Sequence, residues 1–88
     1  MSLEIQWHDT DPETGERRRL RAEKFGGRWR FHWRLRRYER WQPLDPTQAM
    51  WEHVLDSLQR RYRRREGVSD EDVEYVERLL RAWRDEEE

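Results

Sequence analysis

Residues 26–36 contain the feature that most restricts how this chain can fold: a Gly-Gly pair followed by a regular alternation of basic and bulky apolar side chains. Tryptophan, phenylalanine, tryptophan and leucine stand at positions 29, 31, 33 and 35, with arginine or histidine at the even positions between them. Successive side chains of a β-strand point to opposite faces of a sheet, so this alternation predicts a strand with one aromatic face and one basic face.

The two turns that flank the preceding segment set the expected register. Glycine tolerates the positive φ angles of a two-residue hairpin turn, so the Gly-Gly pair predicts a hairpin in which Leu20 lies opposite Trp33. The run Asp-Pro-Glu-Thr-Gly predicts an earlier turn that places Trp7 opposite Leu20. We therefore expect a three-stranded antiparallel β-meander over residues 3–37, with a bend or bulge near Arg36-Arg37.

After residue 43 the apolar period changes from two to 3.6, which predicts helices. Asp45 followed by Pro46 predicts the start of the first helix, because aspartate is a favourable N-cap and proline suits the first helical position. Gly67 predicts its end, since glycine readily adopts the left-handed conformation that closes many helices. We expect this helix over residues 45–66.

A second helix is predicted over residues 69–84. Ser69, with Asp72 three residues later, is close to a capping box and predicts the first turn. Acidic side chains are unfavourable near the negative end of a helix dipole, so residues 85–88 are expected to form a frayed acidic tail.

Together these elements predict an α+β fold, βββαα: a three-stranded antiparallel β-meander followed by two α-helices packed on its aromatic face. A chain of 88 residues is expected to form a single domain, 1–88. Six Trp, three Tyr and two Phe supply large side chains for a small core.

Several classes of function find no support in the sequence. Cysteine is absent, the histidines lie far apart, and no serine has an evident base and orienting group beside it. We therefore expect no enzyme activity, no metal, no cofactor and no small-molecule substrate. No apolar run approaches the ~20 residues of a membrane span, so a cytoplasmic protein without membrane contact is expected.

The basic side chains supply the candidate binding surfaces. Residues 17–65 contain 16 basic and five acidic residues, whereas residues 66–88 contain three basic and ten acidic ones. The predicted sheet collects part of this charge on one face. The candidate binding face consists of Arg17, Arg19, Arg21, Arg34, Arg36 and His32. A secondary basic patch on the first helix consists of Arg60, Arg61 and Arg64. The candidate interaction aromatics are Tyr38 and Trp41.

These surfaces predict a small non-catalytic binding module. The leading expectation is protein–protein interaction or homodimerisation with a partner that the sequence does not identify. The alternative is nucleic-acid binding through the basic face, whose arginines have a spacing that can contact successive phosphates. The predicted architecture resembles the three-stranded-sheet DNA-binding domains of plant transcription factors and phage integrases, although no sequence motif of either family is present. The third expectation is an accessory protein with no autonomous activity. The basic face also has a simpler interpretation, a solvated face in a protein whose genome favours arginine codons.

Overall fold

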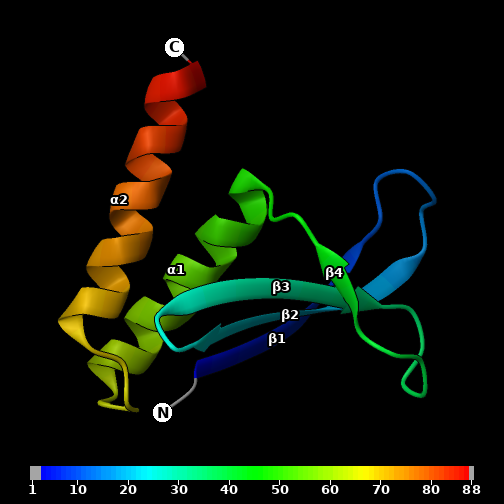
Figure 1. The fold of residues 1–88 in the computed structure, drawn as a ribbon, viewed down its shortest axis with the longest axis horizontal. Helices are drawn as coiled ribbons and strands as arrows, with labels where there is room; N and C mark the ends of the chain where they lie inside the picture. The colour runs from blue at the N-terminus through cyan, green and yellow to red at the C-terminus, as the bar shows by residue number, and fades with distance from the viewer. Residues whose placement is uncertain (1–2, 88) are drawn as a thin grey trace. The chain divides into compact units, whose positions relative to one another are not determined.

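A computed structural model describes residues 3–87, which divide between Asp45 and Pro46 into two compact units. We call them the sheet unit and the helical unit (Figure 1). The sheet unit contains strands β1 (Leu3–Thr10), β2 (Arg17–Phe25), β3 (Arg28–Arg34) and β4 (Gln42–Leu44). The helical unit contains helices α1 (Gln48–Arg63) and α2 (Asp70–Glu87). The α+β class and the order of strands before helices are those predicted, with one strand added. The packing of the helices on the aromatic face, and the single domain 1–88, stay predictions.

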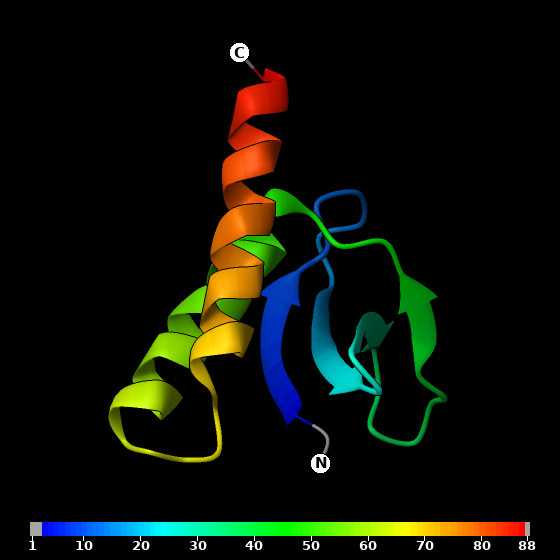
Figure 2. The ribbon, with the colours of Figure 1, turned by 60° about the vertical axis from the view of Figure 1, so that its left-hand side comes forward.

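The sheet is an antiparallel meander in the order β1-β2-β3-β4 (Figure 2). Both predicted registers are confirmed: Leu20 lies opposite Trp7 on one side and opposite Trp33 on the other. Gly26 and Gly27 have φ angles of 58° and 79°, the positive values that a type I′ turn requires at both central positions.

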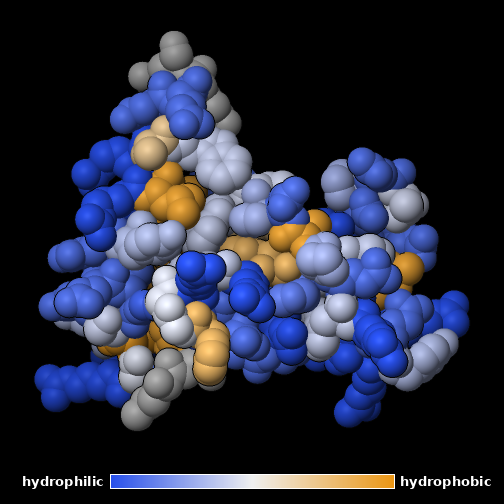
Figure 3. Space-filling view, viewed as in Figure 1, coloured by the Kyte–Doolittle hydropathy of each residue, from blue (hydrophilic) through white to orange (hydrophobic). Residues whose placement is uncertain are grey.

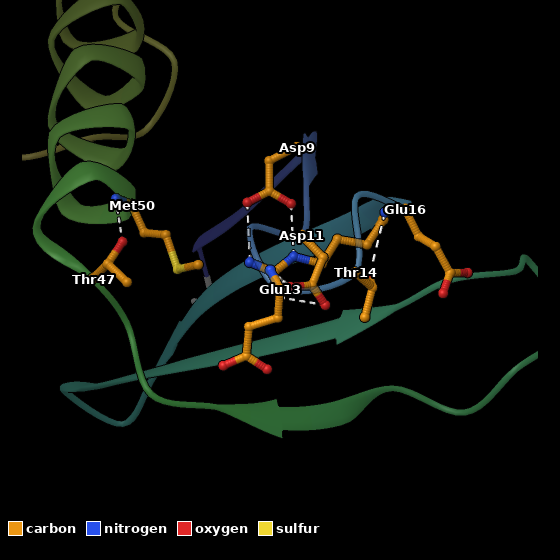
Figure 4. A network of polar contacts seen from close by, with 8 residues as sticks. Asp9, Asp11, Glu13, Thr14, Glu16, Thr47 and Met50 are labelled. Atoms are coloured by element: carbon orange, nitrogen blue, oxygen red, sulfur yellow. Dashed lines mark hydrogen bonds and ion pairs between the residues drawn. The ribbon is translucent and has the colours of Figure 1, made fainter.

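The first turn is also closed as expected. The backbone N–H of Asp11 donates to the carbonyl of Glu16 at 2.8 Å, and that of Gly15 donates to the carbonyl of Asp11 at 2.8 Å. The Asp11 side chain accepts a hydrogen bond from the N–H of Glu13 at 2.9 Å (Figure 4). This local bond favours a turn over continued strand.

The fourth strand was not predicted, and β3 ends at Arg34 before the expected bend. The chain turns where the N–H of Glu39 donates to the carbonyl of Arg36 at 3.0 Å, and β4 then pairs with β3 so that Leu44 lies opposite Phe31. Three residues with a central proline are too short to show an alternating pattern. Pro43 is tolerated because an edge strand has one side that needs no N–H donor.

The aromatic face of the sheet carries the predicted apolar side chains. Ile5, Leu20, Ala22 and Phe31 are each at most 4% exposed. The rings of Trp7 and Phe31 meet edge to face, with centroids 6.4 Å apart. Trp29, Trp33 and Leu35 are half-buried. The opposite side is the basic face.

Helix α1 begins at Gln48, so the predicted start at Asp45-Pro46 is wrong. Thr47 is the N-cap, and its side-chain oxygen accepts a hydrogen bond from the N–H of Met50 at 3.2 Å (Figure 4). Pro46 restricts Asp45 to extended backbone, which an N-cap residue also adopts, so the pair permits a start there, but the Thr47 side chain supplies the cap instead. The hydroxyl of Thr47 is the next capping group along the chain.

The predicted end of α1 at Gly67 is also displaced. Arg65 has φ 58°, and its N–H donates to the carbonyl of Tyr62 while that of Glu66 donates to the carbonyl of Arg61. These two bonds form a Schellman motif, with Arg65 at the left-handed position that glycine usually occupies. The helix therefore closes before Gly67 is reached.

Helix α2 has the predicted capping box. The N–H of Ser69 donates to the Asp72 carboxylate at 3.0 Å, and the N–H of Asp72 donates to the Ser69 hydroxyl at 3.3 Å. Helix α2 is described as far as Glu87, three residues past the predicted boundary at residue 84, while the fraying of the acidic tail stays a prediction and residue 88 lies outside the described residues. Neither glycine nor proline interrupts this segment, and glutamate is a good helix former.

The two helices pack against each other within the helical unit (Figure 2). The apolar residues of each helix are buried only in part: Tyr62 of α1 is 45% exposed, and Val73 and Trp83 of α2 are half-buried. The buried apolar residues of this unit are Met50, Trp51, Val54 and Leu58 of α1, Val68 of the connecting loop, and Val76 and Leu80 of α2.

Candidate functional site

The basic face forms because the register brings arginines of β2 and β3 to the same side of the sheet. Arg19 lies opposite Arg34, and Arg21 lies opposite His32. Directly opposed side chains of an antiparallel pair are separated by about 4.5–5.5 Å at Cβ, so like charges here repel unless something between them relieves the repulsion. Hydrophilic side chains cover most of the sheet unit's surface in the view of Figure 3.

One end of the basic face is neutralised by acidic side chains. Arg21 forms an ion pair with Glu4 at 3.7 Å, and Glu23 lies opposite Arg30 in the ladder. Between this end and the other, Arg19 donates a hydrogen bond to the neutral side-chain amide oxygen of Gln6 at 3.2 Å. This end is therefore mixed in charge.

The other end of the sheet contains a pocket of about 330 Å³. The beginning of β2, the end of β3 and the segment after β3 form its wall. Its lining residues are His8, Arg17, Arg18, Arg19, Arg34, Leu35, Arg36 and Arg37. Six of these eight are arginines, and no described carboxylate is among them. The pocket unites four residues of the predicted binding face and leaves out Arg21 and His32.

Four of the pocket arginines form no ion pair with a described carboxylate, although the Glu39 carboxylate accepts a hydrogen bond from the backbone N–H of the lining residue Leu35 at 3.3 Å. Among the side chains of residues 3–86, no carboxylate forms an ion pair with Arg17, Arg34, Arg36 or Arg37. Arg36 instead donates a hydrogen bond to the hydroxyl of Tyr38 at 2.9 Å. Guanidinium groups that are gathered in a concave site and lack ion-pair partners produce a positive potential that attracts anions.

Arg18 has a structural task and differs from its neighbours. Arg18 is 8% exposed and donates two hydrogen bonds to the carboxylate of Asp9, at 2.7 and 3.1 Å. They are the two dashed lines that end on Asp9 in Figure 4. Asp11 adds a further ion contact at 3.9 Å. The hydrogen bond with Asp9 raises the pKa of Arg18. The pair thus ties the end of β1 to the beginning of β2 at the pocket wall.

Trp41 forms two cation–π contacts, one with Arg34, which lines the pocket, and one with Arg21, which does not. The guanidinium carbon of Arg34 is 4.3 Å from the Trp41 ring centroid, and that of Arg21 is 4.7 Å away. Trp41 is half-buried, whereas Tyr38, the other predicted interaction aromatic, is 79% exposed. Arg34 therefore belongs both to the pocket and to this aromatic contact.

His32 lies on the same face, outside the pocket. Burial is the first cause that lowers the pKa of His32, and the positive charge of Arg21 lowers it further, while Glu23 acts in the opposite direction. The imidazole is consequently neutral near pH 7 and adds little to the positive charge of the face.

The secondary basic patch belongs to the helical unit. Arg60 is paired with Asp56, one turn earlier on α1. Arg61 and Arg64 lie in the last turn and at the C-cap, where cations are favourable near the negative end of the helix dipole. Helix termination and the Asp56 pair therefore account for much of this patch.

The described residues contain neither a cluster of metal ligands nor a membrane-crossing helix. No group of three or more histidine, aspartate or glutamate side chains comes together to hold a metal ion. No helix combines the length and the apolar character that crossing a bilayer requires.

The sequence patterns did not identify two features of this site. The sequence patterns assigned Arg37 only to a bend and did not predict that it lines the pocket. The contact of Trp41 with Arg34 depends on the path of the chain into β4, which was not predicted. The nearest signal was the run of aromatic and basic residues that continues past β3. Comparison with known protein families, with curated proteins and with solved structures finds no match.

Proposed function

We propose that this chain is a non-catalytic module that binds nucleic acid through the basic face of its sheet. The observation that carries the proposal is the arginine-lined pocket, where Arg17, Arg34, Arg36 and Arg37 lack carboxylate partners among the side chains of residues 3–86. Planar guanidinium groups bind phosphate oxygens with two parallel hydrogen bonds, which suits this residue type to nucleic-acid backbones.

The aromatic contact next to the pocket supports the same proposal. Single-stranded nucleic acids are bound by grooves that combine positive charge with aromatic rings, on which bases stack. Trp41 offers such a ring, with Arg34 between it and the pocket. A bound nucleic-acid strand whose phosphate draws Arg34 away from Trp41 would also uncover part of the Trp41 ring.

Charge within the sheet unit matters more here than the charge of the whole chain. The full chain has a net charge of −1, but residues 1–45 contain eleven basic and eight acidic residues. Three of those acidic residues, Glu4, Asp9 and Asp11, are already paired with arginines outside the set of four.

A salt titration tests the proposal. Labelled single-stranded and duplex DNA and RNA are titrated with the protein at two ionic strengths. We expect affinity to fall steeply with salt, with a log–log slope of about −0.7 to −0.9 for each phosphate contact. Arg17→Gln with Arg34→Gln should reduce affinity at least tenfold at low salt.

The matched control is Arg28→Gln with Arg30→Gln. It removes the same charge from the same face at the end where Glu23 lies opposite Arg30. Binding that responds equally to both double variants reports general charge and contradicts a site at the pocket. Absence of micromolar binding at low salt to every nucleic acid tested would end the proposal.

A second candidate function, protein–protein interaction or homodimerisation, has its own supporting observation. Tyr75 is 44% exposed on α2, and with Arg78 and Leu79 it lines a shallow hollow of the helical unit. Sedimentation equilibrium of the protein and of a Tyr75→Ser, Leu79→Ser variant tests self-association. A monomer at every concentration excludes a homodimer.

A further inference from the structure

We propose that the pocket is a site for a phosphate monoester, so that the module prefers a strand that carries a phosphate at its end. The inference rests on the proposed function and names the ligand chemistry of the same site. It concerns the space between the beginning of β2, the end of β3 and the segment that follows β3, a space of about 330 Å³.

The first argument is the number of positive groups around a single space. Arg17 comes from β2, Arg34 from β3, and Arg36 and Arg37 from the following turn. A phosphodiester carries one negative charge, whereas a phosphate monoester carries about −1.5 to −2 near pH 7 and presents three acceptor oxygens. Four arginines without acidic partners among the side chains of residues 3–86 match the monoester better.

The second argument is that the arginines without carboxylate partners are confined to one end of the basic face. A site that follows the backbone of a long duplex needs positive charge along the whole face. Beyond the pocket, Glu4 is paired with Arg21, and Glu23 lies opposite Arg30, so acidic side chains interrupt such a path. Positive charge confined to one end of a sheet suits the end of a chain.

The third argument is the size and support of the pocket. A volume of about 330 Å³ lies at the lower end of the 300–1,000 Å³ typical of small-ligand sites, which is room for a phosphate and part of its sugar. Arg18 contributes to the wall while its charge is matched by Asp9, so it holds the wall in place without competing for the ligand.

The test compares three forms of one short labelled single strand: with a 5′-phosphate, with a 3′-phosphate, and with hydroxyl groups at both ends. Fluorescence anisotropy at fixed ionic strength measures each affinity. We expect a phosphorylated form to bind at least tenfold more tightly than the hydroxyl form. Arg36→Gln with Arg37→Gln should abolish that ratio, whereas Arg28→Gln with Arg30→Gln should preserve it.

Circular dichroism of each variant shows whether it folds, and Arg36→Lys with Arg37→Lys provides a milder test at the same positions. Lysine retains the charge but not the bidentate geometry, so the ratio should fall and not vanish. A ratio that is unchanged in the glutamine variant overturns the assignment of the pocket.

The outcomes separate this inference from the proposed function. Equal affinity for phosphorylated and hydroxyl strands overturns the monoester site and leaves nucleic-acid binding intact. Competition by a nucleoside monophosphate at the affinity of the phosphorylated strand supports the monoester site but identifies a free phosphate ester as its source, which contradicts a strand end. Failure of every strand, of the monophosphate and of inorganic phosphate to bind overturns both proposals.

Discussion

Three consecutive arginines of β2 show how strand geometry assigns different tasks to identical residues. Arg17 and Arg19 point to the basic face and line the pocket, while Arg18 points to the aromatic face and pairs with Asp9. A long side chain with a charged end can be buried in this way because two hydrogen bonds to one carboxylate satisfy it.

Replacing Arg18 should therefore destabilise the protein more than replacing its neighbour. Arg18→Met keeps an apolar stem but leaves the carboxylate of Asp9 without its partner, and we expect a loss of about 1–3 kcal/mol in the free energy of unfolding. Arg17→Met is the matched control and should change stability by less than about 0.5 kcal/mol. Urea denaturation followed by circular dichroism measures both, and equal losses would contradict a structural task for Arg18.

At the scale of the elements, the end of α1 is closed by a residue that is poorly suited to its backbone conformation. Arg65 occupies a left-handed position at φ 58°, which costs a residue with a Cβ about 1–2 kcal/mol. The hydrogen bonds of the Schellman motif hold it there, because they satisfy carbonyls at the end of the helix that would otherwise lack donors.

Arg65→Gly should stabilise the protein by about 0.5–1 kcal/mol, because glycine adopts this conformation without steric cost. Arg64→Gly provides the contrast: that residue has φ −89°, so glycine there adds only backbone freedom to the unfolded state and should destabilise. Both variants remove one positive charge from neighbouring positions. Thermal unfolding measures the two shifts, which should have opposite signs.

The elements also show what sequence patterns can and cannot predict. Alternation and two glycine turns were sufficient for three strands and both registers, because a shift of one residue would place arginines on the aromatic face. β4 was not predicted, because three residues around Pro43 are too few to show a periodic pattern of apolar side chains. The left-handed residue that ends α1 was expected at Gly67, because glycine adopts left-handed backbone without steric cost. Hydrogen bonding decides where that conformation occurs, and here it occurs at Arg65.

The residues of the candidate site likewise divide into those that strand periodicity predicts and those that it does not. The arginines within the strands followed from periodicity, so Arg19 and Arg34 were predicted to share a face and are directly opposed. Arg37 and Trp41 lie in irregular chain after β3, where no period says which way a side chain points. Tertiary structure alone joins them to the strand residues.

At the scale of the whole molecule, a near-neutral composition conceals two units of opposite charge. Residues 1–45 have a small excess of basic residues, and residues 46–88 contain eight basic and twelve acidic ones. Folding concentrates the excess of positive charge further, because the strands place several arginines on one side of the sheet. The nearby carboxylates form ion pairs with Arg18 and Arg21 instead. Local potential, and not net charge, therefore determines what the sheet can attract.

Each unit also contains one histidine whose protonation opposes folding. Burial is the first cause that lowers the pKa of His32 in the sheet unit and of His53 in the helical unit, from an ordinary value of 6.5. The unfolded chain then binds protons more readily than the folded one as the pH falls below this value. Stability contributed by the neutral imidazoles is complete above pH 6.5 and is lost as the pH falls toward the folded pKa values.

The thermal midpoint should accordingly decrease between pH 7.5 and pH 5, and His32→Gln with His53→Gln should make that decrease smaller. The effect of each single variant should be additive, because the two histidines lie in different units and each responds to its own burial. Scanning calorimetry over this pH range measures the midpoints, and the difference between variant and original protein at pH 8 provides the reference for any loss of packing. A double variant whose midpoint falls as steeply as that of the original protein would show that carboxylates, and not these imidazoles, control the acid sensitivity.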